Sequence, residues 1–517
     1  MTKAIPPLAP IAVLAAVVTV LGNLPAAAAD ETGAGGRWGG STGANMAATA
    51  RDLPADPGAA APLWEVKVGN HLYSIPTIDR GRVYIGTNDE GLERPGVKPT
   101  EGGLLLCVEG ATGKLLWRMP SPRFFEGVKD PYHFDQWSCG ICSGPLVKGD
   151  RVYVVGNRGD VLCLDREGQA NGNEGPFLDE LKYMGAEPGT ALLPTDGDIV
   201  WKYDMVRELD VVPHDVCGST LLLLDGLLYA CTSNGIDGPH RSVPRLMAPS
   251  LIVLDAATGA LVAQDGEKIG ARMLHGHWSS PTCGRAGGRG FVFFGGGDGV
   301  LYAFEPARRG AGVGTLVKAW SHDCNPPDYR MRDGKPVPYS RHNDNSPDGP
   351  SEIIGSPVFR VGRVYVAIGQ SPLHGVGRGL LSCLDAATGA EVWSSRLVDR
   401  TLATAAVADG LVYIPDYTGN LHCLDSATGA RCWVHPLGAR TWGSSAFVAD
   451  GKVYVGTEAN VLWTLKAGRE LTVLSRTRLK SVPLTPAASD GVLYIPTQRT
   501  LIAVPGSPLP TGSSTRR

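Results

Sequence analysis

Indole, imidazole and cationic side chains recur in this chain in short clusters that could together hold a planar ligand. The residues that we expect to hold a cofactor are Trp278, Arg400, Arg440, Trp442, Lys480, His214, His275 and His277. Tryptophan offers a flat platform, and arginine or lysine would pair with the carboxylates of an acidic planar molecule. A catalytic base would have to be a carboxylate or one of the histidines.

Oxygen-bearing side chains accompany these clusters and could hold a hard cation. Ca²⁺ takes several oxygen ligands, and the expected ones are Glu352, Asp215 and Asp344. The stretch DNSPDG at 344–349 has glycine in the sixth place of a calcium loop, but Pro347 interrupts it and position twelve is Gly355 rather than an acid. A solvated loop is therefore the alternative for this stretch, and a satisfied polar plug is the alternative for the clusters as a whole.

A short sequence motif that recurs eight times indicates the strands that must position these residues. It is written GRVYIG, DRVYVVG, GLLYACT, GFVFFGG, GRVYVAIG, GLVYIPD, GKVYVGT and GVLYIPT. The last three aromatic residues before the C-terminus, Tyr413, Tyr454 and Tyr494, follow gaps of 48, 41 and 40 residues, and the earlier gaps run from 64 to 76. A strand-rich unit of about 40 residues is typical of a propeller blade.

The rest of each unit agrees with a blade of four strands. A second strand leads to a GATG, AATG or SATG turn, where glycine allows a tight hairpin. Trp117, Trp393 and Trp433 follow three of these turns and are interpreted as outermost-strand residues that pack between blades. The last unit lacks an outer strand, which LWEVKV around Trp64 can supply. We predict an all-β fold, an eight-bladed β-propeller of four-stranded antiparallel blades over residues 61–506, closed by N- and C-terminal strands in one blade.

The two ends of the chain differ from this pattern. Residues 1–29 have the basic start, short apolar run and small-residue end of a signal peptide cleaved near Ala29. The apolar run is too short for a transmembrane segment, and the absence of cysteine near the cut argues against a lipoprotein. We therefore expect a secreted or periplasmic protein with a disordered lead-in at 30–60 and a disordered tail at 507–517.

Composition and cysteine positions narrow the function further. The 517 residues are 43% hydrophobic and 19% charged, with a net charge of −3. We therefore expect no basic surface that could bind nucleic acid. We also expect the protein to be a monomer. Four of the 11 cysteines, Cys107, Cys163, Cys383 and Cys423, occupy one position in different repeats and should be buried and too far apart to bond. Cys139 and Cys142 form CGIC, which leaves a disulfide, a redox pair or two inert thiols open.

The phrases LDAATGAEVW at 384–393 and LDSATGARCW at 424–433 resemble the PQQ-type repeat of bacterial quinoprotein propellers. The resemblance covers Trp64 to Pro505 and implies that the residues before each innermost strand line the mouth of an axial funnel. Most long insertions open on that face, at 87–102, 118–136, 233–249, 320–350 and 370–379. Loops gathered on one face of a rigid scaffold commonly carry binding.

Two kinds of relative give three functional hypotheses. The first is a module that binds a small molecule or a protein partner through the loop-bearing face and the funnel. The second is an enzyme like the quinoprotein alcohol dehydrogenases, with pyrroloquinoline quinone (PQQ) and calcium, oxidising an alcohol or sugar. The third is a cofactor-free scaffold like the propeller subunit of the outer-membrane barrel assembly machine. The sequence lacks the adjacent cysteine pair of the alcohol dehydrogenases and a haem-attachment motif. Fold alone does not choose among the three.

Overall fold

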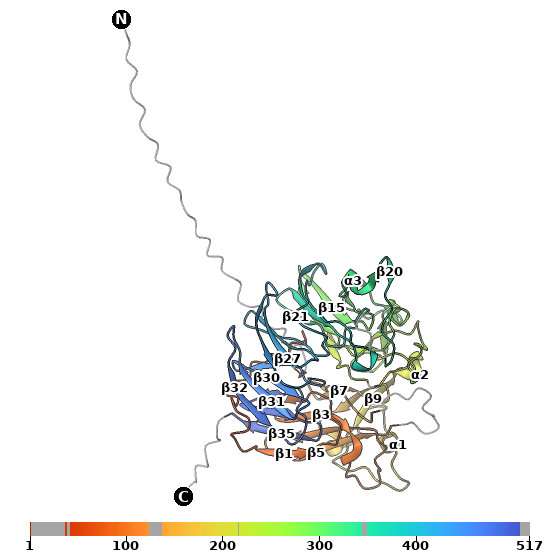
Figure 1. The fold of residues 1–517 in the computed structure, drawn as a ribbon. Coiled ribbons are helices and arrows are strands. Elements are labelled where there is room, and N and C mark those ends of the chain that lie inside the picture. Colours follow the sequence, from red (N-terminus) through yellow and green to blue (C-terminus); the bar gives the residue numbers. More distant parts are fainter. Residues whose placement is uncertain (2–36, 39–41, 124–136, 216, 344–348, 507–517) are drawn as a thin grey trace.

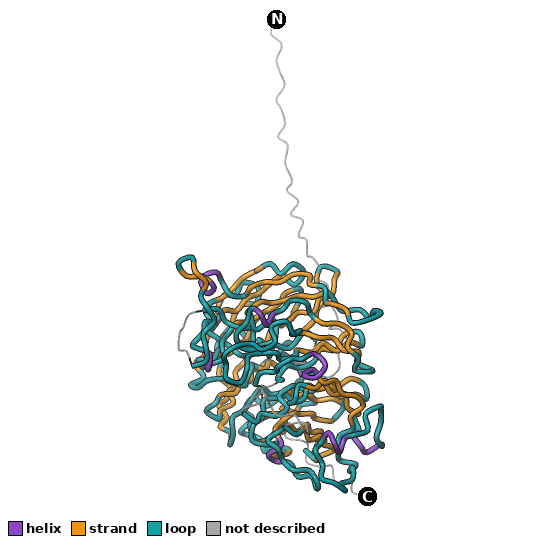
Figure 2. Tube along the Cα trace, turned by 90° about the vertical axis from the view of Figure 1, so that its right-hand side faces the viewer, coloured by secondary structure: helices purple, strands orange, loops and turns teal. Residues whose placement is uncertain are grey.

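The computed structural model describes residues 1, 37–38, 42–123, 137–215, 217–343 and 349–506. Eight antiparallel sheets follow one another around a central axis, which confirms the predicted eight-bladed propeller. The chain runs round the ring from the orange strands to the blue ones (Figure 1), and strands dominate over short helices (Figure 2). The expected signal peptide and C-terminal tail lie outside the described residues, apart from Met1.

The first four blades contain the following strands. Blade 1 has β2 (Thr77–Asp79), β3 (Arg82–Asn88), β4 (Gly103–Glu109) and β5 (Leu115–Ser121). Blade 2 has β6 (Leu146–Lys148), β7 (Arg151–Val155), β8 (Asp160–Asp165) and β9 (Ile199–Asp204). Blade 3 has β10 (Leu222–Leu224), β11 (Leu227–Cys231), β12 (Leu251–Asp255) and β13 (Leu261–Gln264), with β17 (Gly314–Thr315) added in parallel at its outer edge. Blade 4 has β14 (Thr282–Ala286), β15 (Arg289–Gly295), β16 (Val300–Phe304) and β18 (Lys318–Asp323).

The remaining four blades repeat this arrangement with shorter connections. Blade 5 has β21 (Val358–Arg360), β22 (Arg363–Ile368), β23 (Leu380–Asp385) and β24 (Glu391–Ser395). Blade 6 has β25 (Ala406–Ala408), β26 (Leu411–Pro415), β27 (Asn420–Asp425) and β28 (Arg431–Pro436). Blade 7 has β29 (Phe447–Ala449), β30 (Lys452–Thr457), β31 (Val461–Lys466) and β32 (Val473–Arg478). Blade 8 has β33 (Ala487–Ser489), β34 (Val492–Pro496), β35 (Thr500–Pro505) and β1 (Trp64–Lys67).

Short elements lie in the connections between strands. They are the α-helices α1 (Glu180–Tyr183), α2 (Met205–Leu209) and α3 (Pro327–Arg330), the hairpin of β19 (Met331–Arg332) and β20 (Lys335–Pro336), and the 3-10 turns η2 (Asp89–Gly91), η3 (Gly168–Asn171), η4 (Ile269–Ala271) and η5 (Pro372–His374). Among the described residues, every helix is too short or too polar to cross a bilayer.

Ring closure occurs as the sequence predicted. Strand β1 pairs antiparallel with β35, with Trp64 opposite Ala503, and the two strands lie side by side in Figure 1. The eight aromatic residues of the recurring phrase all lie on the second strand of their blades. Eight buried apolar clusters lie between neighbouring blades, so the hydrophobic core is divided around the ring.

Tryptophans on the outer strands join one blade to the next. Trp117 packs against Tyr84 of its own blade, with ring centroids 6.0 Å apart, and its indole N–H donates to the carbonyl of Arg166 in blade 2 at 2.8 Å. The same donation to the following blade is made by Trp201, Trp320, Trp393, Trp433 and Trp64. The predicted role of the outer-strand tryptophans between blades is confirmed, and Trp64 makes this bond across the closure.

The lead-in differs from the expected disordered segment. Its residues 42–48 bind backbone groups of the inner strands, its residues 54–56 bind Tyr454, Ser475 and Thr477 of blade 7, and Trp38, Met46 and Leu53 are buried. Asn45 binds both backbone groups of Val407 at 2.8 Å, so its amide satisfies an unpaired edge of β25. The Ala- and Gly-rich composition suggested disorder, but these backbone groups find partners on the free edges of the innermost strands.

All four repeated cysteines are buried on the third strands of four blades, and the described cysteines form no disulfide. Burial raises the pKa of Cys107, Cys163 and Cys423 to about 12 and that of Cys383 to about 11. Because the thiolate is the reactive form, we predict that a thiol reagent at pH 8 modifies these four residues only after denaturation. Peptide mapping before and after addition of guanidinium measures this, and rapid native labelling would contradict the burial.

A second prediction tests the closure. Replacing Trp64 by alanine removes its packing on Tyr494, at 5.9 Å between ring centroids, and its hydrogen bond to Gly110. We expect a loss of about 3–5 kcal/mol in the free energy of unfolding, as for other buried aromatic truncations. Trp201→Ala is the matched control, because Trp201 occupies the equivalent position in blade 2, whose four strands follow one another in the sequence. Urea unfolding followed by circular dichroism should give similar losses, and a neutral Trp64→Ala would refute the closing role of β1.

Candidate functional site

An axial cavity of about 520 Å³ lies where the innermost strands begin. Each blade contributes residues from its approach segment, defined here as the residues directly before the innermost strand. They include Tyr73, Cys142, Thr220, Trp278, Ser356, Thr404, Trp442 and Thr485. The expectation that these segments line the funnel is therefore supported by the cavity itself. Trp38 and Met46 of the lead-in add to its wall.

Hydroxyl groups link the approach segments of blades 2 to 8 in a series around the axis, called here the hydroxyl ring. The backbone N–H of Thr220 donates to Ser280 Oγ at 3.0 Å, and Ser280 N–H donates in turn to Ser356 Oγ at 3.1 Å. The same bond joins Ser356 to Thr404, Thr404 to Ser445 and Ser445 to Thr485. Gly144 begins the series by donating to Thr220. This hydroxyl ring fixes where the neighbouring side chains enter the cavity.

Five histidines gather at the side of the cavity formed by blades 3, 4 and 5. This five-histidine cluster consists of His214, His240, His275, His342 and His374. His240 Nδ1 lies 2.8 Å from His374 Nε2, and the rings of His275 and His374 stack with centroids 3.9 Å apart. Within two triads, His214–His240–His275 and His240–His342–His374, the ligand atoms all lie within 4.8 Å of one another.

Backbone contacts between loops place these rings. The N–H of Ile236 donates to the carbonyl of His275 at 2.7 Å, which fastens the loop after β11 to the approach segment of blade 4. A turn at Asp237 then presents His240, whose φ of +57° lies in the left-handed region that histidine tolerates better than most residues. The N–H of Asn343 donates to the carbonyl of Leu373 at 2.7 Å and so joins the loops of His342 and His374.

Burial favours the uncharged form of His214, His275 and His374. Burial, and then the neighbouring imidazoles, lower the pKa of His214 and His275 well below the usual value and that of His374 to about 2. Burial alone raises the pKa of Glu352, whose Oε2 lies 3.5 Å from His275 Nδ1. Neutral imidazoles have the nitrogen lone pairs that a metal ion or a hydrogen-bond donor requires.

Several predicted residues are brought together here. His214, His275 and Trp278 are neighbours, with the indole 4.7 Å from the His275 ring between centroids. Asp215, an expected metal ligand, lines the cavity, and burial raises its pKa to about 6. Glu352 is fully buried, and its carboxylate lies 3.5 Å from the imidazole of His275.

The predicted aromatic and cationic residues of blades 6 and 7 lie on the other side of the funnel. Arg440 and Trp442 line the cavity, and Trp442 is 37% exposed. Arg440 Nε binds Glu458 at 2.9 Å, and Glu458 also lines the cavity. Arg400 lies over the ring of Tyr417 at 4.6 Å and donates to the carbonyl of Gly375 at 2.7 Å.

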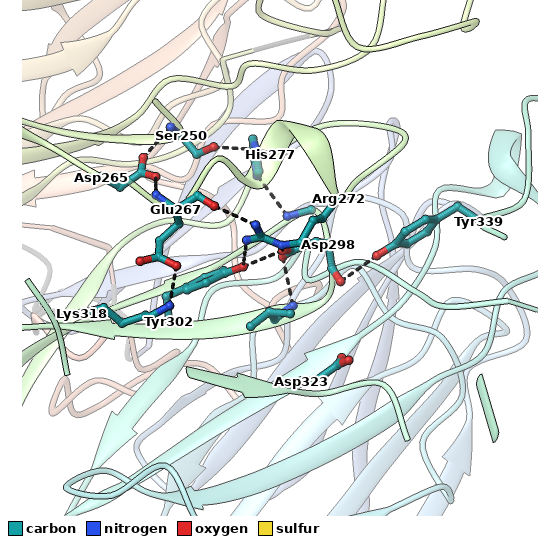
Figure 3. A network of polar contacts seen from close by, with 12 residues as sticks. Ser250, Asp265, Glu267, Arg272, His277, Asp298, Tyr302, Lys318, Asp323 and Tyr339 are labelled. Carbon is teal, nitrogen blue, oxygen red and sulfur yellow. Dashed lines mark hydrogen bonds and ion pairs between the residues drawn. The ribbon is translucent and has the colours of Figure 1, made fainter. Parts of the chain in front are cut away.

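Two predicted cofactor residues are placed elsewhere. Lys480 is exposed and pairs with Glu65 at 3.2 Å on the outside of blade 8. His277 is enclosed in a structural network, with Nε2 3.0 Å from Ser250 Oγ and Nδ1 accepting from the N–H of Gly297, as Figure 3 shows. The network continues through Arg272, Asp298 and Tyr302. His277 alternates with His275 along the segment and so points away from the cluster. Asp344 lies outside the described residues.

Three residues of the cluster were not predicted individually. His240, His342 and His374 belong to the insertions 233–249, 320–350 and 370–379, which the sequence assigned to the loop-bearing face. His240 and His374 are each the single histidine of their insertion, whereas 320–350 also contains His322, so only the common face could have linked the three residues. Their meeting point depends on loop conformation, which the repeat pattern does not specify.

Eight blades whose approach segments line one axial cavity define a β-propeller of the PQQ-repeat class. The family model described as outer membrane protein assembly factor BamB matches residues 56–323 and 377–504, so the chain belongs to this family. None of the curated proteins searched is significantly similar to the chain.

Solved structures share the fold at low sequence identity. BamB from Moraxella catarrhalis is 14% identical, with a TM-score of 0.52 over 86% of this chain and 97% of its own. The quinohemoprotein alcohol dehydrogenase ADHIIG from Pseudomonas putida HK5 is 12% identical, with a TM-score of 0.57 over 94% of this chain and 82% of its own. A europium-containing methanol dehydrogenase is 12% identical, with a TM-score of 0.56 over 89% of each chain.

The cavity is a poor match for PQQ with calcium. A planar molecule with several carboxylates needs unengaged cations, whereas the arginine at this wall, Arg440, is already paired with Glu458, and Asp215 adds a second acid. Calcium prefers an oxygen cage, whereas the buried carboxylate of Glu352 lies beside the imidazole of His275. The lining of the cavity therefore does not fit that pair.

Proposed function

We propose that this protein is a binding module whose axial cavity holds a planar, largely apolar small molecule. The observation that carries the proposal is the aromatic wall of the cavity, made by Trp38, Tyr73, Trp137, Trp278 and Trp442. Trp137 and Trp442 are 55% and 37% exposed, which leaves large apolar surfaces in contact with solvent at a concave site. Such surfaces commonly mark ligand sites.

The size and charge of the cavity support the same class of ligand. A volume of about 520 Å³ lies within the roughly 300–1,000 Å³ of small-molecule pockets. Its acids, Asp215 and Glu458, outweigh the paired Arg440, which favours a neutral or cationic molecule over an anionic one. Polar hydroxyls of the ring supply donors and acceptors that would orient it.

A protein partner at the loop-bearing face is the second candidate. The family description names an assembly factor, and Leu246 and Met247, in the insertion 233–249, are exposed by 48% and 62%. Exposed apolar side chains on a functional face favour protein contact. This surface and the cavity are separate, so one does not exclude the other. Export to the periplasm or the medium is part of both proposals.

Titration with a neutral planar dye such as Nile red tests the small-molecule proposal. We expect saturable binding by the wild type, weakened in Trp442→Ala by about 0.5–1.5 kcal/mol, or roughly 2- to 10-fold in Kd, through the lost ring stacking. Because Trp442 is partly exposed, its melting temperature should change little. Val434→Ala, equally exposed but on the outer strand β28, should bind like the wild type.

The contrasting result is that of a structural plug. In that case Trp442→Ala would lower the melting temperature as a core truncation does, and dye binding would be absent or unaffected. The variant Arg440→Gln tests the role of the charge. A neutral dye should bind this variant and the wild type equally well. A loss of affinity for an anionic dye would identify Arg440 as a ligand contact.

A further inference from the structure

The five-histidine cluster is the densest gathering of metal-ligating side chains in the part of the chain that the structure describes. The two groups of at least three histidine, cysteine or acidic side chains whose ligand atoms lie within 4.8 Å are both triads of this cluster. Both consist of imidazoles alone, and both contain His240. Five of the 11 histidines of the chain therefore meet at one place.

The polar atoms of the cluster lack the partners that a purely structural network would give them. His214 Nε2, His275 Nδ1, His342 Nδ1 and His374 Nδ1 are buried and make no hydrogen bond among the described residues. Both carboxylate oxygens of Glu352, a residue with no exposed surface, also make no hydrogen bond, but Oε2 lies 3.5 Å from His275 Nδ1, and Asp215 Oδ1 lies 3.5 Å from His214 Nε2. By contrast, His277 has partners at both ring nitrogens, 3.0 Å away in each case. Buried polar atoms are nearly always paired, and a bound ion is one of the reasons for exceptions.

We propose that the five-histidine cluster binds one divalent transition metal ion, with His240 as the ligand that its two triads share. Three or more imidazoles are the donor set that Zn²⁺, Cu²⁺, Ni²⁺ and Co²⁺ prefer, whereas Ca²⁺ and Mg²⁺ prefer oxygen. The ligands come from the connections of three successive blades, so the ion would join loops that backbone hydrogen bonds already bring together, as between Ile236 and His275. His374 and His240, now 2.8 Å apart, would exchange their mutual hydrogen bond for bonds to the metal.

Glu352 is assigned as a positioning residue for this ion. Its Oε2 lies 3.5 Å from His275 Nδ1, and its own backbone is held by two hydrogen bonds to Gly369, at 2.8 and 2.9 Å. A carboxylate that holds the second nitrogen of a metal-bound imidazole fixes the ring and raises its basicity. A buried carboxylate also offsets the charge that neutral imidazoles leave on the ion.

The ion would lie behind the wall of the axial cavity rather than within the aromatic part. Trp278 packs against His275 and His214, with ring centroids 4.7 and 6.2 Å apart, and it lines the cavity together with His275. Metal binding therefore goes beyond the proposed binding of an organic molecule and does not require it.

Calorimetry on the full chain without a polyhistidine tag tests the proposal, after dialysis against a chelator. We expect one Zn²⁺ per chain, no saturable Ca²⁺ binding, and a melting temperature that rises with Zn²⁺. His240→Gln should lose the binding, and Glu352→Gln should weaken it by about 10- to 100-fold. The matched control is His435→Gln, whose ring lies on β28 against Trp463, outside the cluster, and should leave Zn²⁺ binding unchanged.

Cu²⁺ supplies a readout that reports the ligand atoms. The electron paramagnetic resonance spectrum should show nitrogen couplings in the wild type and in His435→Gln, and they should be lost in His240→Gln. His342→Gln is the second variant, because His240 and His342 are both partly exposed loop residues whose replacement should leave the propeller folded.

Several outcomes would overturn the inference. They are a wild type without saturable Zn²⁺ or Cu²⁺ binding, binding that persists in folded His240→Gln, and an equal loss in His435→Gln. Failure here is distinct from failure of the proposed small-molecule site, because Trp442→Ala should retain full Zn²⁺ binding while it loses dye affinity.

Discussion

The attachment of each blade to the next is the interaction on which the rest of this structure depends. It is made at two radii, by hydroxyl groups near the axis and by indole N–H groups at the rim, as between Thr220 and Ser280 and between Trp117 and Arg166. A four-stranded sheet cannot bury both faces alone, so its apolar residues are shared with its two neighbours. Wherever the two bonds occur, they are donated in the same direction around the ring: the hydroxyl bonds link blades 2 to 8 in series, and the indole bonds include the one across the closure, from Trp64 to blade 1.

In this ring of blades, most residues that stabilise the fold are different from those that line the candidate binding site. Strand residues, rim tryptophans and the hydroxyl groups of the approach segments hold the blades, so the other side chains of these segments and the loops can carry polar chemistry without disturbing the core. The lead-in extends the same principle, because it satisfies free edges of the inner strands, through Asn45 on β25, while adding Trp38 and Met46 to the cavity wall.

The repeat made the ring predictable, because each blade uses the same strand phrase, turn and packing partners. The approach segments were predictable for the same reason, and so His214, His275, Trp278 and Trp442 were placed near the axis. The incorrect predictions concern residues whose position does not follow from the sequence repeat. His277 and His275 are two residues apart, and only the local backbone decides which one enters the cavity. His240, His342 and His374 lie in insertions without a repeat, and the lead-in has a composition that resembles disorder but contains Trp38, Met46 and Leu53, which are buried.

The two sides of the funnel have different chemistry, and this difference argues against a simple transfer of function from fold relatives. Blades 3 to 5 present neutral imidazoles and a buried acid, while Trp442 and Glu458 of blade 7 present an indole and a carboxylate. A ring designed around a polyanionic planar cofactor would concentrate unpaired cations at the axis, whereas here Arg440 is neutralised by Glu458. Nitrogen ligands on one side and an aromatic wall on the other would instead suit a metal ion and an apolar molecule bound next to each other, with Trp278 lying between the imidazoles and the cavity.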